Sequence, residues 1–108
     1  MKILAIEREP PVATDQQPTS TLLKAEALRA WELHQAGIIR ELYFRADRTE
    51  AVLVLECADV AEARSILDTL PLVREKLIGF ELIPVVAYPG FARLFESIDP
   101  GLPHTTGG

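Results

Sequence analysis

Apolar and polar residues alternate along this chain in two different rhythms. Stretches with a period of two predict four strands, at residues 2–8, 38–45, 51–57 and 79–88. Stretches with a period near 3.6 predict two helices, at residues 20–36 and 60–70. The order strand, helix, strand, strand, helix, strand is typical of the α+β class, in which a four-stranded antiparallel sheet carries two helices on one face.

Local signals mark where these elements begin and end. Three hydroxyl residues at positions 19–21 can each cap the first helix. Asp59, followed three residues later by Glu62, forms a capping-box arrangement for the second helix, which ends at Pro71. The 108 residues predict one domain over 1–98, closed by a short helix from residue 91, and a flexible C-terminal tail over 99–108.

The first helix is amphipathic. At 100° per residue its apolar face consists of Leu23, Ala27, Ala30, Trp31 and His34. The charged residues Glu26, Arg29 and Glu32 lie mostly off this face. We expect the apolar face to rest on the sheet, with Trp31 in the core.

Alternation also sorts the strand residues by face. Alternate residues of the third strand, from Ala51 to Cys57, suit the face under the helices. We expect the other face to carry six aliphatic residues: Ile3, Ala5, Val52, Val54, Ile83 and Val85. Two helices cover one side of such a sheet, so the second side requires a partner, most simply a second copy packed sheet to sheet in a homodimer or a larger homo-oligomer.

The length of the turn between the second and third strands determines which of their residues lie on that second face. A two-residue turn at Arg48-Thr49 would pair Tyr43 with Val54 and Arg45 with Val52. In this register one face of the hairpin carries a wholly apolar set of residues and the other face carries a mixed set.

Five polar residues are predicted among the aliphatic residues of the second face: Glu7, Tyr43, Arg45, Glu56 and Glu81. Carboxylates in apolar surroundings have a raised pKa, and a nearby Arg45 would lower it. Such groups can serve as acid and base in a closed cavity, and Glu81 is the best single candidate. Alternatively, the glutamates lie at wet sheet ends or pair with Lys or Arg, while Tyr43 and Arg45 pack in an interface.

Composition excludes several function classes. With 11 Lys and Arg against 16 Asp and Glu, the net charge is −5, which argues against a nucleic-acid surface. No apolar run reaches the length of a membrane span, and a single cysteine fits a reducing cytoplasm. The sequence has neither a Gly-rich phosphate loop nor a ligand set for zinc or haem, so we expect no cofactor and no metal.

Several segments between Leu28 and Pro89 resemble the muconolactone isomerase family of the dimeric α+β barrel superfamily. The most specific are Leu70-Pro71-Leu72 and Phe80-Glu81-Leu82-Ile83-Pro84, with Arg40-Glu41-Leu42-Tyr43 and the closing Tyr88-Pro89 as further matches. The resemblance implies ferredoxin-like protomers that pair sheet to sheet around an apolar pocket for a small lactone or ring-containing acid. It also implies a cofactor-independent shift of a double bond by proton transfer.

The resemblance and the face analysis assign different roles. By position, Glu56 and Glu81 fall where the family tends to have acidic residues, so they are the predicted acid/base pair. The face analysis predicts Glu7, Tyr43 and Arg45 as substrate-binding residues. Two other functions stay open on the same fold, namely a non-catalytic small-molecule-binding protein and a cofactor-independent monooxygenase-type tailoring enzyme, as does a purely structural dimer.

Overall fold

A computed structural model describes residues 1–96 of the chain. Its elements are β1 (Lys2–Arg8), α1 (Ser20–Gln35), β2 (Ile39–Phe44), β3 (Ala51–Glu56), α2 (Val60–Leu67), α3 (Pro71–Arg74), β4 (Gly79–Val85) and the 3-10 helix η1 (Pro89–Phe95). The predicted order is confirmed, with one added short helix, because Pro71 begins α3 instead of only ending α2. Across these described residues, no helix is both long and apolar enough to cross a membrane.

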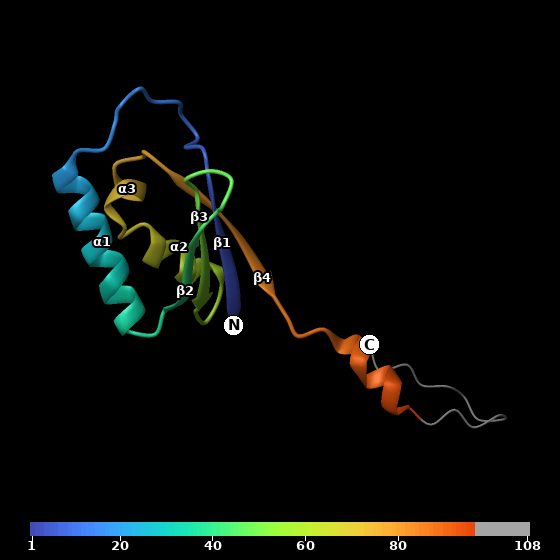
Figure 1. Ribbon diagram of the computed structural model, residues 1–108. Coiled ribbons are helices and arrows are strands. Elements are labelled where there is room, and N and C mark those ends of the chain that lie inside the picture. Colours follow the sequence, from blue (N-terminus) through green and yellow to red (C-terminus); the bar gives the residue numbers. More distant parts are fainter. Residues whose placement is uncertain (97–108) are drawn as a thin grey trace.

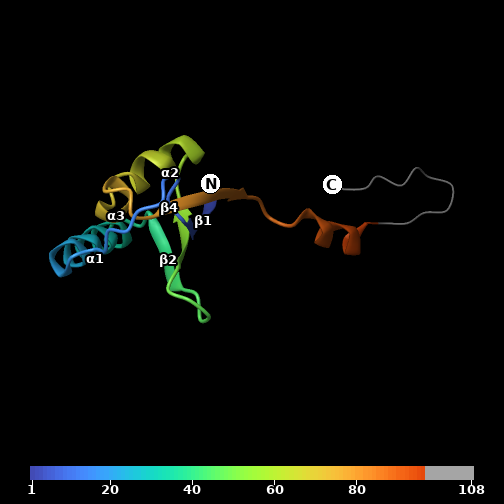
Figure 2. The same cartoon turned by 90° about the horizontal axis from the view of Figure 1, so that it is seen from above.

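The four strands form one antiparallel sheet in the order β2-β3-β1-β4. Helices α1, α2 and α3 lie on the same side of it (Figures 1 and 2), which confirms the predicted α+β architecture. The predicted caps are also present. Thr19 Oγ1 accepts the Leu22 N–H at 3.1 Å, and Asp59 Oδ1 accepts the Glu62 N–H at 2.8 Å.

The faces of β1 differ from the prediction. Ile3 pairs with Leu55 and Ala5 pairs with Leu53, so both residues lie in the core and are fully buried. The expectation that they lie on the open face was wrong, because both alternating sets of β1 are aliphatic and the strand alone does not indicate its inner side. The open face, meaning the sheet face away from the helices, carries Leu4, Ile6, Val52, Val54, Ile83 and Val85.

The β2–β3 hairpin is longer than predicted. Tyr43 pairs with Val52 and Glu41 with Val54, and residues 45–50 form the connection, closed by the Arg45 N–H and the Glu50 carbonyl at 2.9 Å. The two-residue turn was therefore wrong. The residues of β2 and β3 still lie on the predicted faces of the sheet. The observed register differs from the predicted one by two positions, and side chains of a strand point to the same face every two residues.

Helix α1 is rotated from its predicted position. Leu33 is its buried residue, with Leu22, Glu26, Arg29 and Ala30 half-buried on the same side. Trp31 is 57% exposed, so its predicted place in the core was wrong. The helix packs on α3 and on the edge strand β2, and this position turns the side with Glu26 toward the body.

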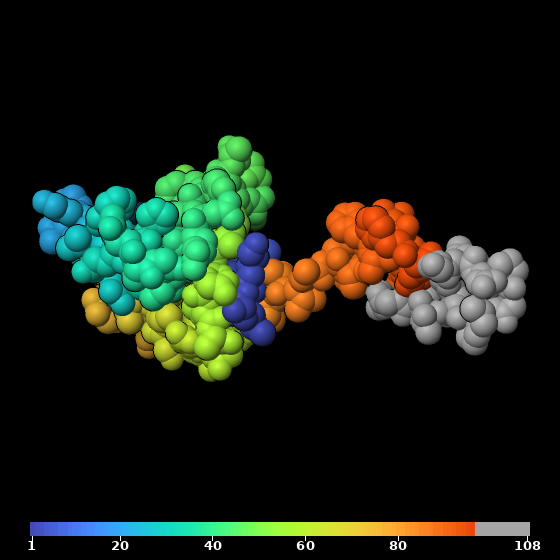
Figure 3. Space-filling view, turned by 90° about the horizontal axis from the view of Figure 1, so that it is seen from below, coloured from blue at the N-terminus to red at the C-terminus, as the bar shows by residue number. Residues whose placement is uncertain are grey.

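Beyond β4 the chain leaves the body as a C-terminal arm, residues 86–96 (Figures 1 and 3). Its large apolar residues are exposed: Val86, Tyr88, Phe91, Leu94 and Phe95. The rings of Tyr88 and Phe91 meet edge to face with centroids 5.0 Å apart. The predicted helix over 91–98 is replaced by η1, while residues 97 and 98 and the predicted tail over 99–108 lie outside the described residues.

Candidate active site

A cavity of about 300 Å³ lies between α1 and the inner face of the sheet. Its wall is almost entirely apolar and consists of Leu23, Ala27, Ala30, Ile39, Leu42, Phe44, Ala51, Leu53, Leu70, Leu72, Ile78 and Phe80. Two carboxylates, Glu7 and Glu26, complete the lining. The volume is at the lower end of the range for small-molecule sites, so a compact ring compound is the appropriate size of ligand.

Glu7 reaches the cavity from the far end of β1. Glu7 follows Ile3 and Ala5 at a spacing of two residues, so all three side chains lie on the helix-covered face. Its cross-strand partner on β4 is Phe80. Its Oε1 accepts the Ala51 N–H at 3.0 Å. Burial raises the pKa of Glu7, the Ala51 N–H lowers it, and the nearby Glu50 charge raises it, with a raised pKa as the result. The expectation that Glu7 shares a face with Glu56 and Glu81 was wrong, for the same reason as for Ile3.

Glu26 enters from α1 and was not among the predicted site residues. Its Oε1 accepts the Leu72 N–H at 2.9 Å. This donor is available because Leu72 lies in the first turn of α3, behind Pro71, where a backbone N–H has no partner within the helix. Burial raises the pKa of Glu26, the Leu72 N–H lowers it, and the charge of Glu7 raises it further, so that the net shift is upward.

The helical projection overlooked Glu26 because it centred the sheet-facing side of α1 near Ala27, whereas the buried side is centred on Leu33; Leu23, Ala27 and Ala30 of the predicted face still line the cavity. One signal could have identified it. Leu22, Ala30 and Leu33 make a second apolar stripe at helical spacing, and Glu26 interrupts this stripe at its centre. A carboxylate at such a position is held in apolar surroundings when that side packs.

The two carboxylates give the cavity acid/base chemistry. Burial is the main cause of the raised pKa of both groups, and the charge of Glu7 adds to the upward shift at Glu26. An ionised carboxylate can take a proton from carbon, and a protonated one can donate to a carbonyl oxygen. In the described part of the chain, no group of three or more His, Cys, Asp or Glu could hold a metal ion.

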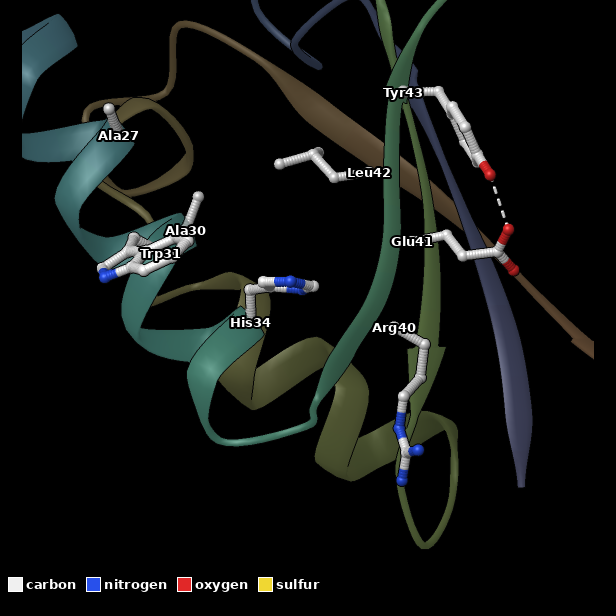
Figure 4. A pocket seen from close by; sticks show the side chains of 8 residues that line it. All are labelled: Ala27, Ala30, Trp31, His34, Arg40, Glu41, Leu42 and Tyr43. Atoms are coloured by element: carbon white, nitrogen blue, oxygen red, sulfur yellow. Dashed lines mark hydrogen bonds between the residues drawn. The ribbon is translucent and has the colours of Figure 1, made fainter.

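An outer groove of about 550 Å³ lies between α1 and β2, next to this cavity. Figure 4 shows its lining: Ala27, Ala30, Trp31, His34, Arg40, Glu41, Leu42 and Tyr43. Ala27, Ala30 and Leu42 line both spaces, so the groove adjoins the cavity. In Figure 4, Trp31 lies on α1 across the groove from Leu42 of β2.

The predicted acid/base residues, Glu56 and Glu81, lie on the open face and are not brought together. Glu56 is opposite Lys2 and Glu81 opposite Ile6, four residues along β1, or about 13 Å. Glu56 pairs with the Met1 ammonium at 3.0 Å, which lowers its pKa, and Glu81 pairs with Arg8 at 3.3 Å. The side chains of Glu56 and Glu81 are each 45% exposed, so in the single chain both carboxylates are in contact with solvent and form ion pairs. Their catalytic role stays a prediction.

The other predicted binding residues also lie apart from the cavity. The Tyr43 hydroxyl donates to Glu41 Oε1 at 2.6 Å, on the side of β2 away from Leu42 (Figure 4), and this bond raises the pKa of Tyr43. Arg45 lies in the β2–β3 connection, where its guanidinium donates to both carboxylate oxygens of Asp47, at 2.8 and 2.6 Å. Substrate binding by Tyr43 and Arg45 therefore stays a prediction.

Comparison with known proteins adds a family and a fold. The family model described as muconolactone delta-isomerase matches residues 3–90. A crystal structure of muconolactone isomerase superposes with a TM-score of 0.68 at 21% sequence identity, covering 82% of this chain and 92% of that chain. A search of curated protein sequences found no match. The family match includes all four strands and both carboxylates of the cavity.

Proposed function

Because this chain belongs to the muconolactone delta-isomerase family, we propose that it is an isomerase that moves a carbon–carbon double bond within a small lactone. The observation that carries the proposal is the Glu7–Glu26 pair, two acids of raised pKa in an otherwise apolar cavity. Chemistry of this kind needs a base and a hydrogen-bond donor for the developing enolate, and we assign these two roles to the two carboxylates of the cavity.

The proposed reaction has two proton-transfer steps. Ionised Glu7 takes a proton from the carbon at one end of the allylic system, and the C–H electrons form a dienolate. Protonated Glu26 donates a hydrogen bond to the carbonyl oxygen, where the negative charge collects. Glu7 then returns the proton to the carbon at the other end, so the double bond has moved. One C–H bond is broken and one is formed, and no electron acceptor is required.

Glu7 is assigned as the base because its charge helps to keep the proton on Glu26. The Ala51 N–H holds the Glu7 carboxylate at the end of β3, and the Leu72 N–H holds Glu26 from the opposite wall. Since both carboxylates are anchored by backbone, neither needs to reorganise when charge develops on the substrate.

NMR of the full chain in heavy water tests this proposal. The substrates are muconolactone and its methyl ester, with a protein-free sample for the spontaneous reaction. We expect isomerisation with deuterium incorporation by the wild type, and a loss of about 10²–10⁴-fold in Glu7→Gln. Binding without exchange would favour the non-catalytic small-molecule-binding interpretation instead.

Glu81→Gln and Glu56→Gln are the matched controls. Each removes one carboxylate from the open face by the same isosteric change. We expect activity within about threefold of wild type, since neither residue lines the cavity. A large loss in either variant, with Glu7→Gln active, would contradict our assignment and support the role that the sequence predicts for Glu56 and Glu81.

We also propose that the protein is a homo-oligomer in which the open faces of two copies pack together. The aliphatic residues of this face are only half-buried within one chain, and the helices cover the other side of the sheet. The exposed apolar residues of the C-terminal arm add a second surface that a further copy can cover. A sheet-to-sheet interface of this kind would also enclose the Arg8–Glu81 pair.

A further inference from the structure

We propose that the unpaired edge of strand β2 is a second binding subsite, where the Leu42 N–H holds an oxygen acceptor on a substituent of the substrate. The acceptor is a carboxylate or carbonyl oxygen outside the lactone ring. This inference rests on the proposed function and adds a residue that orients the substrate. Its basis is the position of β2 at the margin of the sheet, where the strand has one paired and one unpaired edge.

Hydrogen bonding in the β2–β3 hairpin indicates which backbone groups face outward. The Arg45 N–H donates to the Glu50 carbonyl at 2.9 Å. Hydrogen-bonded and non-hydrogen-bonded pairs alternate along an antiparallel ladder, so Tyr43 is the next residue of β2 that bonds to β3. The residues at the intervening positions, Leu42 and Phe44, therefore direct their N–H and C=O groups away from β3, toward the unpaired edge.

Leu42 lies where the cavity and the outer groove adjoin. It lines both spaces and is 49% exposed. Across the groove, α1 contributes Ala27 and Ala30, whose small side chains leave the space beside β2 open. Glu41 and Tyr43 turn their side chains away from Leu42 (Figure 4), so β2 meets the groove with its backbone edge. A ligand whose ring occupies the cavity can therefore reach the Leu42 N–H with a substituent.

Two carbonyl groups near the groove are bonded by side chains that line it. The Nδ1 of His34 lies 2.9 Å from the Ile39 carbonyl, and this nitrogen carries the hydrogen because a carbonyl oxygen only accepts. The Arg40 Nε donates to the Gly37 carbonyl at 2.6 Å. These oxygens are thus satisfied, whereas the Leu42 N–H has no protein partner within residues 1–96. An oxygen acceptor is the complement of that free donor.

Two ligands test the subsite. Muconolactone carries a carboxylate on a side chain of its unsaturated lactone ring, and the second ligand is the same ring without the side chain. Amide NMR of the isotope-labelled full chain reports each backbone group. We expect muconolactone to shift the Leu42 amide proton downfield in a saturable titration, and the bare ring to leave it in place. The Tyr43 amide, which is bonded to β3, is the internal reference.

Proline at position 42 removes the donor itself. Leu42→Pro retains an apolar side chain, and the unpaired edge of a sheet tolerates proline. Leu42→Val is the matched control, because it also shortens the side chain but keeps the N–H. We expect muconolactone to bind about tenfold more weakly to Leu42→Pro than to Leu42→Val. The bare ring should have the same Kd for both variants.

A second pair of variants addresses the bonded carbonyl and decides the question if Leu42→Pro does not fold. His34→Leu leaves the Ile39 carbonyl without a donor, facing the groove, and should weaken muconolactone binding about threefold. His34→Asn is the control, since its amide can still donate to that carbonyl, and should bind like the wild type. Equal Kd values for these two variants would contradict the subsite.

The outcomes separate the subsite from the proposed function. If muconolactone shifts the cavity amides of Ala51 and Leu72 but not that of Leu42, the subsite is overturned and the isomerase stays in place. Equal Kd values for Leu42→Pro and Leu42→Val have the same meaning. A Leu42 shift that follows protein concentration instead of ligand would show a second copy at this edge and would also overturn the subsite. Binding at Leu42 without isomerisation would support the subsite and refute the proposed function.

Discussion

The two faces of this sheet place the same residue type in opposite environments. On the helix-covered face, Glu7 and Glu26 sit in an apolar cavity, each anchored by one backbone N–H, and burial raises the pKa of both. On the open face, Glu56 and Glu81 are half in water and each faces a cation. The contrast shows that a carboxylate acquires acid/base character from what surrounds it, and that the side of a strand decides those surroundings.

The largest expected difference between the faces is in packing. Leu55 is fully buried between sheet and helices, so Leu55→Ala should lower the free energy of unfolding by about 2–5 kcal/mol. Leu4 is half-buried on the open face, so in dilute protein Leu4→Ala should lower the free energy of unfolding by less than Leu55→Ala does. Denaturant unfolding measures both. If a second copy covers the open face, the cost of Leu4→Ala increases with protein concentration, and a cost independent of concentration would argue against that partner.

The next effect concerns assembly. Val54 lies at the centre of the open face, between Leu4 and Glu41 on the neighbouring strands. Val54→Arg should weaken a sheet-to-sheet dimer by at least about tenfold in Kd, because it places a long charged side chain at the centre of an aliphatic interface. Light scattering across a dilution series is the measurement. Lys2→Arg, at the margin of the same face, is the control and should leave assembly unchanged. A wild type with the mass of one chain at every concentration would contradict the proposed oligomer.

A smaller effect is the pH dependence of stability. The pKa of Glu26 is higher in the folded protein than in the unfolded chain, so the protonated side chain stabilises the fold. This stabilisation is fully present below the pKa of the unfolded chain and is lost as the pH rises through the pKa of the folded protein. Glu26→Gln should therefore match the wild type near pH 4. At pH 8 it should be more stable by no more than about 1 kcal/mol, since the group keeps contact with water.

Glu56→Gln should show the opposite sign. The Met1 ammonium lowers the pKa of Glu56 in the folded protein, so the ionised side chain stabilises the fold. This stabilisation is present above the pKa of Glu56 in the unfolded chain and is lost as the pH falls through its pKa in the folded protein. The variant should be less stable than the wild type at neutral pH and should match it in acid. Thermal melts from pH 3 to 8 compare the two variants, and slopes of equal sign would contradict the contrast between the faces.

The smallest effect is expected at the other end of the open face. The Arg8–Glu81 pair is solvent-exposed in the single chain, so Glu81→Gln should change stability by less than about 1 kcal/mol. The difference should shrink in 1 M salt, which screens exposed charges. Chemical unfolding at low and high salt measures it. A larger, salt-independent cost would indicate that a partner buries the pair.

Much of the fold followed from short-range patterns in the sequence. Periodicity identified all four strands and the two main helices, and the capping residues Thr19 and Asp59 start α1 and α2 as expected. The resemblance to the muconolactone isomerase family agrees with the family match over residues 3–90. Of the predicted site residues, Glu7 lies in the cavity, though on the other face than expected.

Which sides of these elements meet was decided only by the tertiary structure. Both sets of alternating residues in β1 are aliphatic, and α1 has two apolar stripes, so local pattern permits either orientation of each. Pairing of β1 with β3 and packing of α1 on α3 resolve both choices, and they bring Glu7 and Glu26 to one cavity. Periodicity and caps depend on residues a few positions apart, whereas the inward side of an element depends on long-range contacts that bury the most apolar surface together.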